Sequence, residues 1–256
     1  MKIGMMADLY KPHVSGVTNY ISLNKKVLEE AGHEVYVFTF GGVDYKDDET
    51  NIIRSPGLPL AVKGYNFNTR YTLQARRLLQ TMDVVHVHHP FLSGTLALLY
   101  CRPKGIPIVF TNHTRYDLYA QAYVPVFADV LGELAMGGYL PSFARGVDLV
   151  VSPSPGMREV LIKAGVDVPI DVVPNGINLK PFQEKVEPGD RGLLGFNDQD
   201  VLLFFVGRLG PEKNLEFLLQ AFAAAVQAYP NAGLVVVGEG SERSDLETFL
   251  EQENLT

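Results

Sequence analysis

The sequence of 256 residues has one cysteine and no long hydrophobic run. A single cysteine, Cys101, excludes an internal disulfide and fits a reducing compartment such as the cytoplasm, where we expect a buried, unreactive thiol. No stretch approaches the ~20 consecutive apolar residues that a helix needs to cross a bilayer. Residues 1–8 reach an aspartate too early for a secretory signal peptide, so they are predicted to form a first strand. These absences indicate a globular cytoplasmic protein.

The chain also lacks an excess of positive charge, since its formal net charge is −7. Residues 1–178 carry 16 basic and 16 acidic side chains, whereas residues 179–256 carry 6 and 13. Proteins that bind the phosphate backbone of nucleic acids need a basic surface. Nucleic acid is therefore not expected as a partner.

One segment lacks acidic residues altogether, because no Asp or Glu occurs between Glu49 and Asp83. Residues 68–81 within it are compatible with an amphipathic helix, and such a basic helix can rest on an anionic membrane surface. An ordinary solvated helix face is the alternative. The candidate membrane contacts are Arg70, Arg76 and Arg77, within a basic set that also includes Arg54 and Lys63.

Strand-like and helix-like segments alternate along the chain, which predicts an α/β fold with parallel sheets and right-handed crossovers. Strands are predicted at residues 2–7, 34–40, 51–54, 83–88, 106–111, 148–152, 170–173, 201–205 and 234–237. Helices are predicted at residues 16–31, 68–81, 92–100, 155–164 and 215–229, in an interrupted region ending at 144, and in a last segment ending near 253. Ser154 and Pro155 have the residue types of a helix cap and first helical position.

The length of the chain favours two domains. The boundary is predicted in a polar, proline-containing segment, which gives a first domain at 1–176, a linker at 177–198 and a second domain at 199–256. Two strand–helix units cannot cover both faces of a parallel sheet. We therefore expect the second domain to be incomplete and the chain to be the N-terminal portion of a longer protein.

Two cations, Arg208 and Lys213, stand where the strand at 201–205 leads into the next helix. The carboxyl ends of parallel strands form a ligand crevice, and helix N-termini there favour anions. The pair is suited to hold a diphosphate, and two solvated surface charges are the alternative. Nearby, Gly238 and Gly240 are expected to serve a strand-to-helix turn.

Three histidines, at positions 86, 88 and 89, raise the question of a metal site. His86 and His88 are predicted to share one strand face, but no Asp, Glu or Cys lies at ligand spacing nearby. A catalytic zinc site needs at least three protein ligands. We expect no metal, and imidazoles that face the crevice at a strand end.

Four segments, at residues 12–17, 111–117, 173–177 and 207–214, occur in an order that resembles the family-four retaining glycosyltransferases. The resemblance covers all 256 residues and is strongest to bacterial diacylglycerol glucosyltransferases. It implies the GT-B fold with two Rossmann-like domains. It also implies transfer of a sugar, glucose being the first choice, from a nucleotide-sugar to an acceptor, a membrane glycerolipid being the first choice. A family relative with a soluble acceptor and a truncated, non-catalytic sugar-nucleotide or lipid-binding module are the alternatives.

The resemblance also implies roles for individual residues. The donor would be held by Ser15, Gly16, Gly207, Arg208 and Lys213. The catalytic set would be His113, Arg208 and Lys213, and the acceptor would meet Arg115, Tyr116 and Asp117. Ser15 departs from the family pattern of two adjacent glycines, and Gly16 serving as a plain turn residue is the alternative to its donor role. For His113 the alternative is a loop-fixing role, and for Arg115 and Asp117 it is helix capping.

Two further expectations concern what the protein needs. Nucleotide-sugar is expected as a co-substrate, with no cofactor and no metal, because the two cations stabilise the leaving diphosphate. The family places a pair of glutamates, eight positions apart, late in the second domain, and this chain ends before they would occur. The chain alone is therefore expected to show little transfer activity. A cytoplasmic protein, peripheral on the inner face of the membrane, is expected.

Overall fold

The computed structural model describes residues 1–59, 66–67, 70–116, 118 and 134–253. The chain forms two compact units. The first comprises residues Met1–Asp117 and Asp129–Pro181, and the second comprises residues Leu118–Ala128 and Phe182–Thr256. Among the described residues, no helix combines the length and the apolar character needed to span a membrane.

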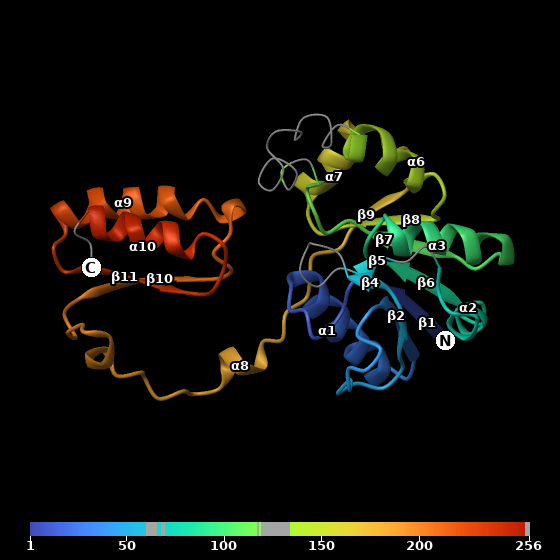
Figure 1. The fold of residues 1–256 in the computed structure, drawn as a ribbon, viewed down its shortest axis with the longest axis horizontal. Helices are drawn as coiled ribbons and strands as arrows, with labels where there is room; N and C mark the ends of the chain where they lie inside the picture. The colour runs from blue at the N-terminus through green and yellow to red at the C-terminus, as the bar shows by residue number, and fades with distance from the viewer. Residues whose placement is uncertain (60–65, 68–69, 117, 119–133, 254–256) are drawn as a thin grey trace. The chain divides into compact units, whose positions relative to one another are not determined.

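The first unit is built on a parallel sheet of seven strands in the order β3-β2-β1-β6-β7-β8-β9 (Figure 1). The strands are β1 (Lys2–Met6), β2 (Glu34–Phe40), β3 (Ile52–Ser55), β6 (Val84–Val87), β7 (Ile108–Thr111), β8 (Leu149–Ser152) and β9 (Ile170–Val172). A separate antiparallel pair consists of β4 (Leu58–Pro59) and β5 (Asn66–Phe67). Strand order reverses at β1, which pairs with β2 on one side and β6 on the other. Such a reversal is where ligands bind in open α/β sheets.

Helices cover both faces of this sheet. They are α1 (Gly16–Glu30), α2 (Leu73–Leu79), α3 (Leu92–Tyr100), α6 (Leu140–Ala144) and α7 (Pro155–Lys163), with a 3-10 turn at Arg102–Lys104 and a π-helical segment at Leu134–Tyr139. Met5 and Met6 are neighbours in β1 yet belong to different hydrophobic clusters, because successive strand residues point to opposite faces. The cluster with Met5 includes Ile21 of α1, and the cluster with Met6 includes residues of α2, α3 and α6.

Local sequence signals explain where several helices begin and end. The Ser15 hydroxyl accepts a hydrogen bond from the Thr18 backbone N–H at 3.2 Å, and the Thr18 hydroxyl accepts one from the Ser15 N–H at 2.8 Å. This reciprocal pair is a capping box, which starts α1. Gly32 then follows α1 in the left-handed region at φ 85°. The cap predicted at Ser154 and Pro155 is confirmed at the start of α7.

The helix predicted over residues 68–81 is shorter, because α2 comprises only Leu73–Leu79. Thr72 caps it by accepting a hydrogen bond from the Ala75 N–H at 3.2 Å, so Arg70 precedes the helix. The prediction was wrong at both ends, because it counted the N-cap Thr72 and the residues from the C-cap Gln80 onward as helical. Cys101 is buried as expected, and burial raises the pKa of its thiol to about 12.

The second unit contains two parallel strands, β10 (Val201–Val206) and β11 (Ala232–Val237). The remaining elements after the first unit are α8 (Lys180–Gln183), which overlaps the division between the units, α9 (Leu215–Ala228), α10 (Arg243–Gln252) and 3-10 turns at Arg191–Leu194 and Pro211–Lys213. Leu209, Leu215, Leu219 and Leu246 form its core. Helices α9 and α10 lie on the same side of the two strands (Figure 1). The two parallel α/β units confirm the predicted fold class.

Candidate functional site

Three central strands of the first unit bring polar residues to one edge of the sheet. β1 leads to Asp8, β6 leads to His88 and His89, and β7 leads to Asn112 and His113. Because β1, β6 and β7 are adjacent and parallel, the residues that follow them meet at the carboxyl edge. This edge is the candidate functional site of the first unit.

Histidine side chains form a connected cluster at this edge. His88 is fully buried, and its Nδ1 lies 3.1 Å from Nε2 of His113. The rings of His86 and His88 are 4.2 Å apart, which agrees with the prediction that they share a strand face. His86 Nε2 lies 2.7 Å from the hydroxyl oxygen of Thr111. The predicted site residue His113 is thus held by a histidine that the sequence had suggested only as a crevice-facing imidazole.

Burial keeps these imidazoles neutral. It lowers the pKa of His86 to about 4 and, aided by the neighbouring histidines His89 and His86, lowers that of His113 to about 3. The pKa of His88 lies well below its ordinary value for the same reason. At neutral pH these side chains therefore act as uncharged hydrogen-bonding groups.

Within the described residues, no three or more His, Cys, Asp or Glu side chains are placed to hold a metal ion. Four ring nitrogens of the histidine cluster contact protein atoms. His89 Nδ1 accepts a hydrogen bond from the Asp8 backbone N–H at 3.2 Å, in addition to the contacts of His86 and His88 described above.

Asp8 supports the site and was missed by sequence reasoning. Its buried carboxylate accepts hydrogen bonds from the Ser93 N–H at 2.7 Å and the Ser93 hydroxyl at 2.6 Å. The first residue before α3, Phe91, makes no side-chain cap of its own. Asp8 therefore caps α3 from a distance, as a carboxylate at a helix N-terminus does. The position of Asp8 directly after the first strand was the sequence feature that could have indicated this role.

The segment before α1 contains two predicted donor-binding residues. Ser15 uses its hydroxyl and N–H in the capping box, so its side chain serves the helix. Gly16, the first residue of α1, is exposed, and a Cβ built on it would meet no atom within 4 Å. The helix N-terminus at Gly16 is therefore accessible, and its backbone favours anions.

The predicted acceptor residues follow β7. Arg115 and Tyr116 are partly exposed, whereas Asp117 lies outside the described residues. The ring of Tyr116 meets that of Phe91 edge-on at 5.1 Å, and Phe91 stacks on Tyr139 at 5.5 Å. Phe91 and Tyr139 thus form an aromatic cluster with Tyr116. Because these three residues are far apart in the sequence, local patterns did not predict that their rings would meet.

In the second unit, the predicted cations occupy the turn after β10. Arg208 and Lys213 are both exposed, and Arg208 Nη2 lies 2.6 Å from a carboxylate oxygen of Glu212. The arginine predicted to hold a diphosphate is thus paired with an acid four residues along the chain. Such a half-exposed pair contributes only ~0–1 kcal/mol, because water screens it. A dianionic ligand can therefore compete for Arg208.

Backbone contacts hold this turn in place. Gly207 N–H donates to Val237 O at 3.0 Å, and Leu209 N–H donates to Glu239 O at 3.0 Å. A Cβ on Gly238 would lie 1.8 Å from Gly207 O. The close approach of two loops explains this glycine, in agreement with the predicted role in the turn.

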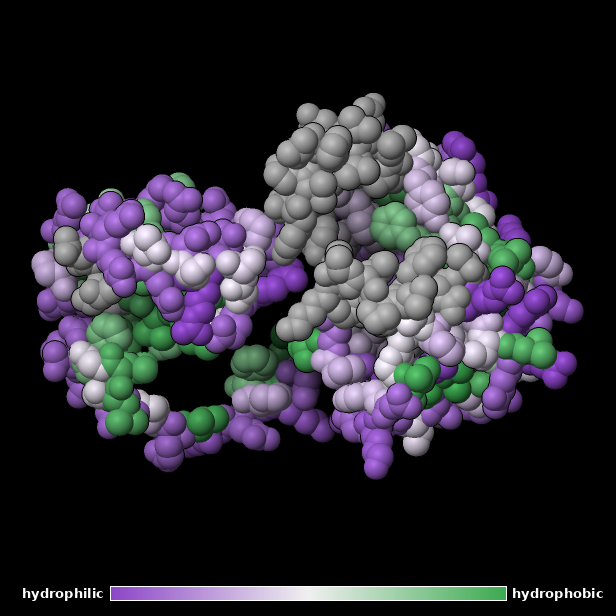
Figure 2. All heavy atoms as spheres, in the orientation of Figure 1, coloured by the Kyte–Doolittle hydropathy of each residue, from purple (hydrophilic) through white to green (hydrophobic). Residues whose placement is uncertain are grey.

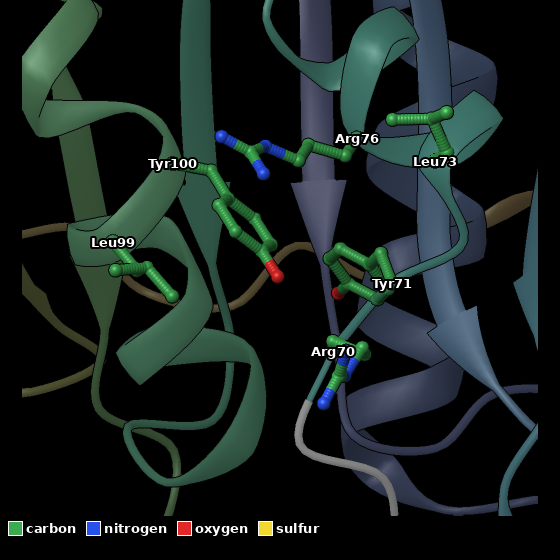
Figure 3. Close-up of a pocket in the computed structure, with 6 residues that line it drawn as sticks. All are labelled: Arg70, Tyr71, Leu73, Arg76, Leu99 and Tyr100. Atoms are coloured by element: carbon green, nitrogen blue, oxygen red, sulfur yellow. The ribbon is translucent and has the colours of Figure 1, made fainter.

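The predicted membrane contacts lie around α2. A cavity of about 520 Å³ is lined by Arg70, Tyr71, Leu73, Arg76, Leu99 and Tyr100 (Figure 3). The guanidinium of Arg76 lies over the ring of Tyr100 at 4.8 Å, which is a cation–π contact. Leu73 and Leu99 are 62% and 58% exposed. The structure brings Arg70 and Arg76 to one cavity and leaves Arg77 exposed outside its lining.

The fold and this edge define a class of protein: an α/β protein with two Rossmann-like units and ligand-facing strand ends. The chain belongs to Glycosyltransferase Family 4, which matches residues 14–180, and residues 188–256 match Glycosyl transferases group 1.

Two relatives match almost the whole chain. The alpha-monoglucosyldiacylglycerol synthase of Acholeplasma laidlawii is 29% identical over 98% of this chain and 66% of its own length. The protein of the same name from Streptococcus pneumoniae is 32% identical over 96% of this chain and 57% of its own length. The chain thus covers less than two thirds of the length of either relative.

Solved structures share the fold. The structure of Anabaena Alr3699/HepE in complex with UDP superposes with a TM-score of 0.69 at 17% identity, covering 100% of this chain and 67% of that one. WaaG, a glycosyltransferase involved in lipopolysaccharide biosynthesis, superposes with a TM-score of 0.60 at 15% identity, covering 98% and 67%. The likeness to these structures supports the GT-B type of fold for the chain.

Proposed function

We propose that the protein is a retaining glycosyltransferase that moves glucose from a nucleotide-sugar to a diacylglycerol-type membrane lipid. The observation that carries this proposal is the match of 96–98% of the chain to two alpha-monoglucosyldiacylglycerol synthases. Their names describe an alpha-linked product. Transfer from an alpha-linked sugar nucleotide to such a product retains the anomeric configuration.

In this proposal the donor sugar meets His113 and the diphosphate meets Arg208 and Lys213. A neutral His113 offers a hydrogen bond to a sugar oxygen without adding charge to the site. Breaking the glycosidic bond leaves negative charge on the diphosphate, and two fixed cations stabilise that charge. Loss of one such stabilising group elsewhere costs about 3–4 kcal/mol in the transition state. We propose on this ground that the reaction needs neither a metal nor another cofactor.

Gly16 is proposed to let its backbone N–H approach the donor phosphates. Gly207 is proposed to let the donor come close to the backbone of its turn, because its own N–H is bonded to Val237 O. Gly16 is supported in this role by its exposed place at the start of a helix of 15 residues. Ser15 is proposed to act through the helix cap that presents Gly16. The acceptor is proposed to meet Arg115 and Tyr116, and Asp117, the next residue in the sequence, is proposed for the same role.

We propose that the protein docks on the cytoplasmic leaflet through the surface of α2. Arg70, Arg76 and Arg77 offer positive charge, and the exposed Leu73 and Leu99 offer apolar contact beside it. Anionic lipid attracts such residues by about 1 kcal/mol for each cation near the surface.

A transfer assay tests the proposal. The chain is compared with a chimera in which residues 1–180 precede the C-terminal domain of the Acholeplasma laidlawii relative, using UDP-, GDP- and ADP-glucose with diacylglycerol in mixed micelles. We expect the chimera to form an alpha-glucosyl lipid and His113→Ala to lower its rate at least tenfold, on the order of one lost hydrogen bond to the transition state. A chimera that glucosylates only soluble acceptors would contradict the lipid assignment.

The same assay distinguishes a second candidate, a nucleotide-sugar or lipid-binding module without transfer activity. Binding of donor by the chain, with no transfer by either the chain or the chimera, would support that candidate.

A further inference from the structure

His88 is the most deeply buried side chain of the histidine cluster, and it is the one that contacts His113. It is fully buried, its Nδ1 lies 3.1 Å from His113 Nε2, and its own Nε2 has no hydrogen-bond partner among the described residues. An unpartnered buried nitrogen costs free energy. Packing alone therefore does not explain why a histidine occupies this buried position.

Rings from two elements, α1 and β6, contact the His88–His113 pair. Tyr20 of α1 meets the His113 ring edge-on at 4.8 Å and the His88 ring at 5.7 Å. The ring of His86 in β6 lies 4.2 Å from that of His88. The His113 ring is thus held by neighbours from α1 and from the end of β6, and its Nε2 is directed into the protein. Nδ1 is the nitrogen of His113 that is left to meet a ligand.

Two arrangements of protons satisfy the hydrogen bond between the rings, since each neutral imidazole carries one N–H. In the first arrangement His113 donates from Nε2, so its Nδ1 is a bare acceptor. His88 then carries its proton on Nε2, a buried N–H that has no acceptor. If His88 donates from Nδ1, its Nε2 is a bare lone pair and His113 carries its proton on Nδ1. Orphaned buried N–H groups are rarer in proteins than under-used acceptors. The second arrangement is therefore favoured.

The surroundings keep the pair uncharged. The titratable groups that act on it are His86, His89 and Tyr20, and burial lowers the pKa of His113 and His88 far enough that neither is protonated at neutral pH. Protonation of both rings would place donors on both facing nitrogens and remove the hydrogen bond, whereas a single added proton would keep that bond and put an N–H on both outer nitrogens. Neutrality thus leaves one shared proton between the two rings.

We propose that His88 is a positioning residue that holds His113 as its Nδ1–H tautomer. His113 then donates a hydrogen bond from Nδ1 to an oxygen of the donor sugar, and it neither takes nor gives a proton during transfer. A neutral imidazole that donates a hydrogen bond is an established way to polarise an oxygen. The donor-sugar contact rests on the proposed function, whereas the tautomer does not.

Long-range 1H–15N NMR of the histidine rings tests the tautomer in the 256-residue chain itself. We expect His113 to show a protonated, pyrrole-type Nδ1 and a pyridine-type Nε2 at pH 7.5, with no change down to pH 6. A pyrrole-type Nε2 on His113, or a charged ring in this range, would overturn the proposal. Because this measurement needs no activity, its result is independent of whether transfer is observed.

Substitutions then separate positioning from packing. His88→Asn keeps an N–H near the position of Nδ1, so we expect it to preserve the His113 tautomer. His88→Leu fills the space without a donor and should let His113 exchange between its two tautomers. His86→Leu is the matched control, because His86 bonds to Thr111 and not to His113. An unchanged His113 tautomer in folded His88→Leu would overturn the role of His88. If the leucine variant fails to fold, the wild-type spectrum still decides the tautomer, and a changed His113 tautomer in His88→Asn would overturn the role of His88.

In the chimera, His88→Leu should lower kcat about tenfold or more with KM for diacylglycerol within about twofold, and His88→Asn should restore most of kcat. A loss of kcat with little change in KM is expected when a residue aligns another group that acts in the transition state. Equal losses of kcat in the leucine and asparagine variants would contradict positioning. Absence of transfer in the wild-type chimera would instead contradict the proposed function and leave the NMR result in force.

Discussion

Buried polar side chains at the sheet edge of the first unit are satisfied by partners from distant parts of the chain. Asp8 bonds to Ser93, 85 positions away, and His88 bonds to His113, 25 positions away. Removing one member of a buried hydrogen-bonded pair leaves the other without a partner, which costs more than the bond itself contributes. At the scale of single residues, these pairs join the strand ends into one site.

Asp8→Ala is predicted to destabilise the first unit by about 1–3 kcal/mol, because it leaves buried donors at the start of α3 without an acceptor. Urea unfolding followed by circular dichroism measures this loss. Asp8→Asn keeps an acceptor oxygen and should cost less. Equal stability of the alanine variant and the wild type would show that α3 does not need the carboxylate.

The buried histidines predict a pH dependence of stability. In the unfolded chain a histidine titrates near 6.5, whereas the folded pKa values of His86 and His113 are about 4 and about 3. As pH falls below 6.5, the unfolded state binds protons that the folded state does not, so stability decreases until pH reaches the folded values. Between pH 7.5 and 5.0 each histidine should cost about 2 kcal/mol.

Urea unfolding at several pH values checks this dependence. His86→Gln should reduce the decrease between pH 7.5 and 5.0, since glutamine does not titrate. His33→Gln is a control from the same unit, because His33 is partly exposed and lies outside the histidine cluster. If the two variants have the same pH dependence, burial of His86 is not the cause.

At the scale of elements, sequence patterns within a segment predicted helices and strands well. Contacts between distant segments could not be predicted from these local patterns. β2 at Glu34–Phe40 and α3 at Leu92–Tyr100 were predicted with the observed bounds, because alternation and apolar content belong to the segment itself. For the candidate site, motif order singled out His113 and Arg208, which the structure places after β7 and β10. The pairing of Arg208 with Glu212 and the cluster of Phe91 with Tyr116 depend on how loops fold back, which local pattern does not encode.

The turn after β10 predicts an effect of Glu212 on anion binding. Glu212→Gln removes the negative charge beside Arg208, and we expect UDP to bind the chain a few-fold more tightly, since a surface pair is worth ~0–1 kcal/mol. Isothermal titration calorimetry measures the change. Glu247→Gln is the matched control, because Glu247 forms the same kind of pair with Arg243 on α10. Weaker binding by Glu212→Gln would mean that Glu212 positions Arg208 for the ligand.

The surface of α2 predicts membrane binding that depends on charge. Replacing Arg70, Arg76 and Arg77 with alanine should reduce sedimentation with anionic liposomes at low salt, by up to about 3 kcal/mol at ~1 kcal/mol for each cation. High salt should reduce wild-type binding in the same way. The matched control replaces Arg102, Arg145 and Arg158, which carry the same charge elsewhere on the first unit. Unchanged partitioning of the α2 variant would contradict docking through this surface.

At the scale of the whole molecule, the two units differ in how much apolar surface they bury. The central strands of the first unit are covered on both faces, whereas β10 leaves Val201, Phe204 and Val206 63%, 59% and 74% exposed. Figure 2 shows hydrophobic atoms gathered on the strand side of the second unit. Burial of apolar surface is the main favourable term in folding, at about 25 cal/mol for each Å².

This difference predicts that the second unit opens more readily than the first. Each strand of a two-stranded sheet has only one neighbour, so β10 and β11 should lose their hydrogen bonds at a lower free energy than β1, β6 and β7. Hydrogen–deuterium exchange with mass spectrometry should show faster exchange in residues 201–206 and 232–237 than in residues 2–6 and 84–87. The edge strands β3 and β9 are the internal control, since each also has one neighbour but belongs to the larger sheet.

If residues 201–206 are protected as strongly as residues 2–6, apolar burial does not set the stability of the second unit. The charge of residues 179–256, 13 acidic against 6 basic, would then need to be tested as a cause by repeating the exchange at high salt.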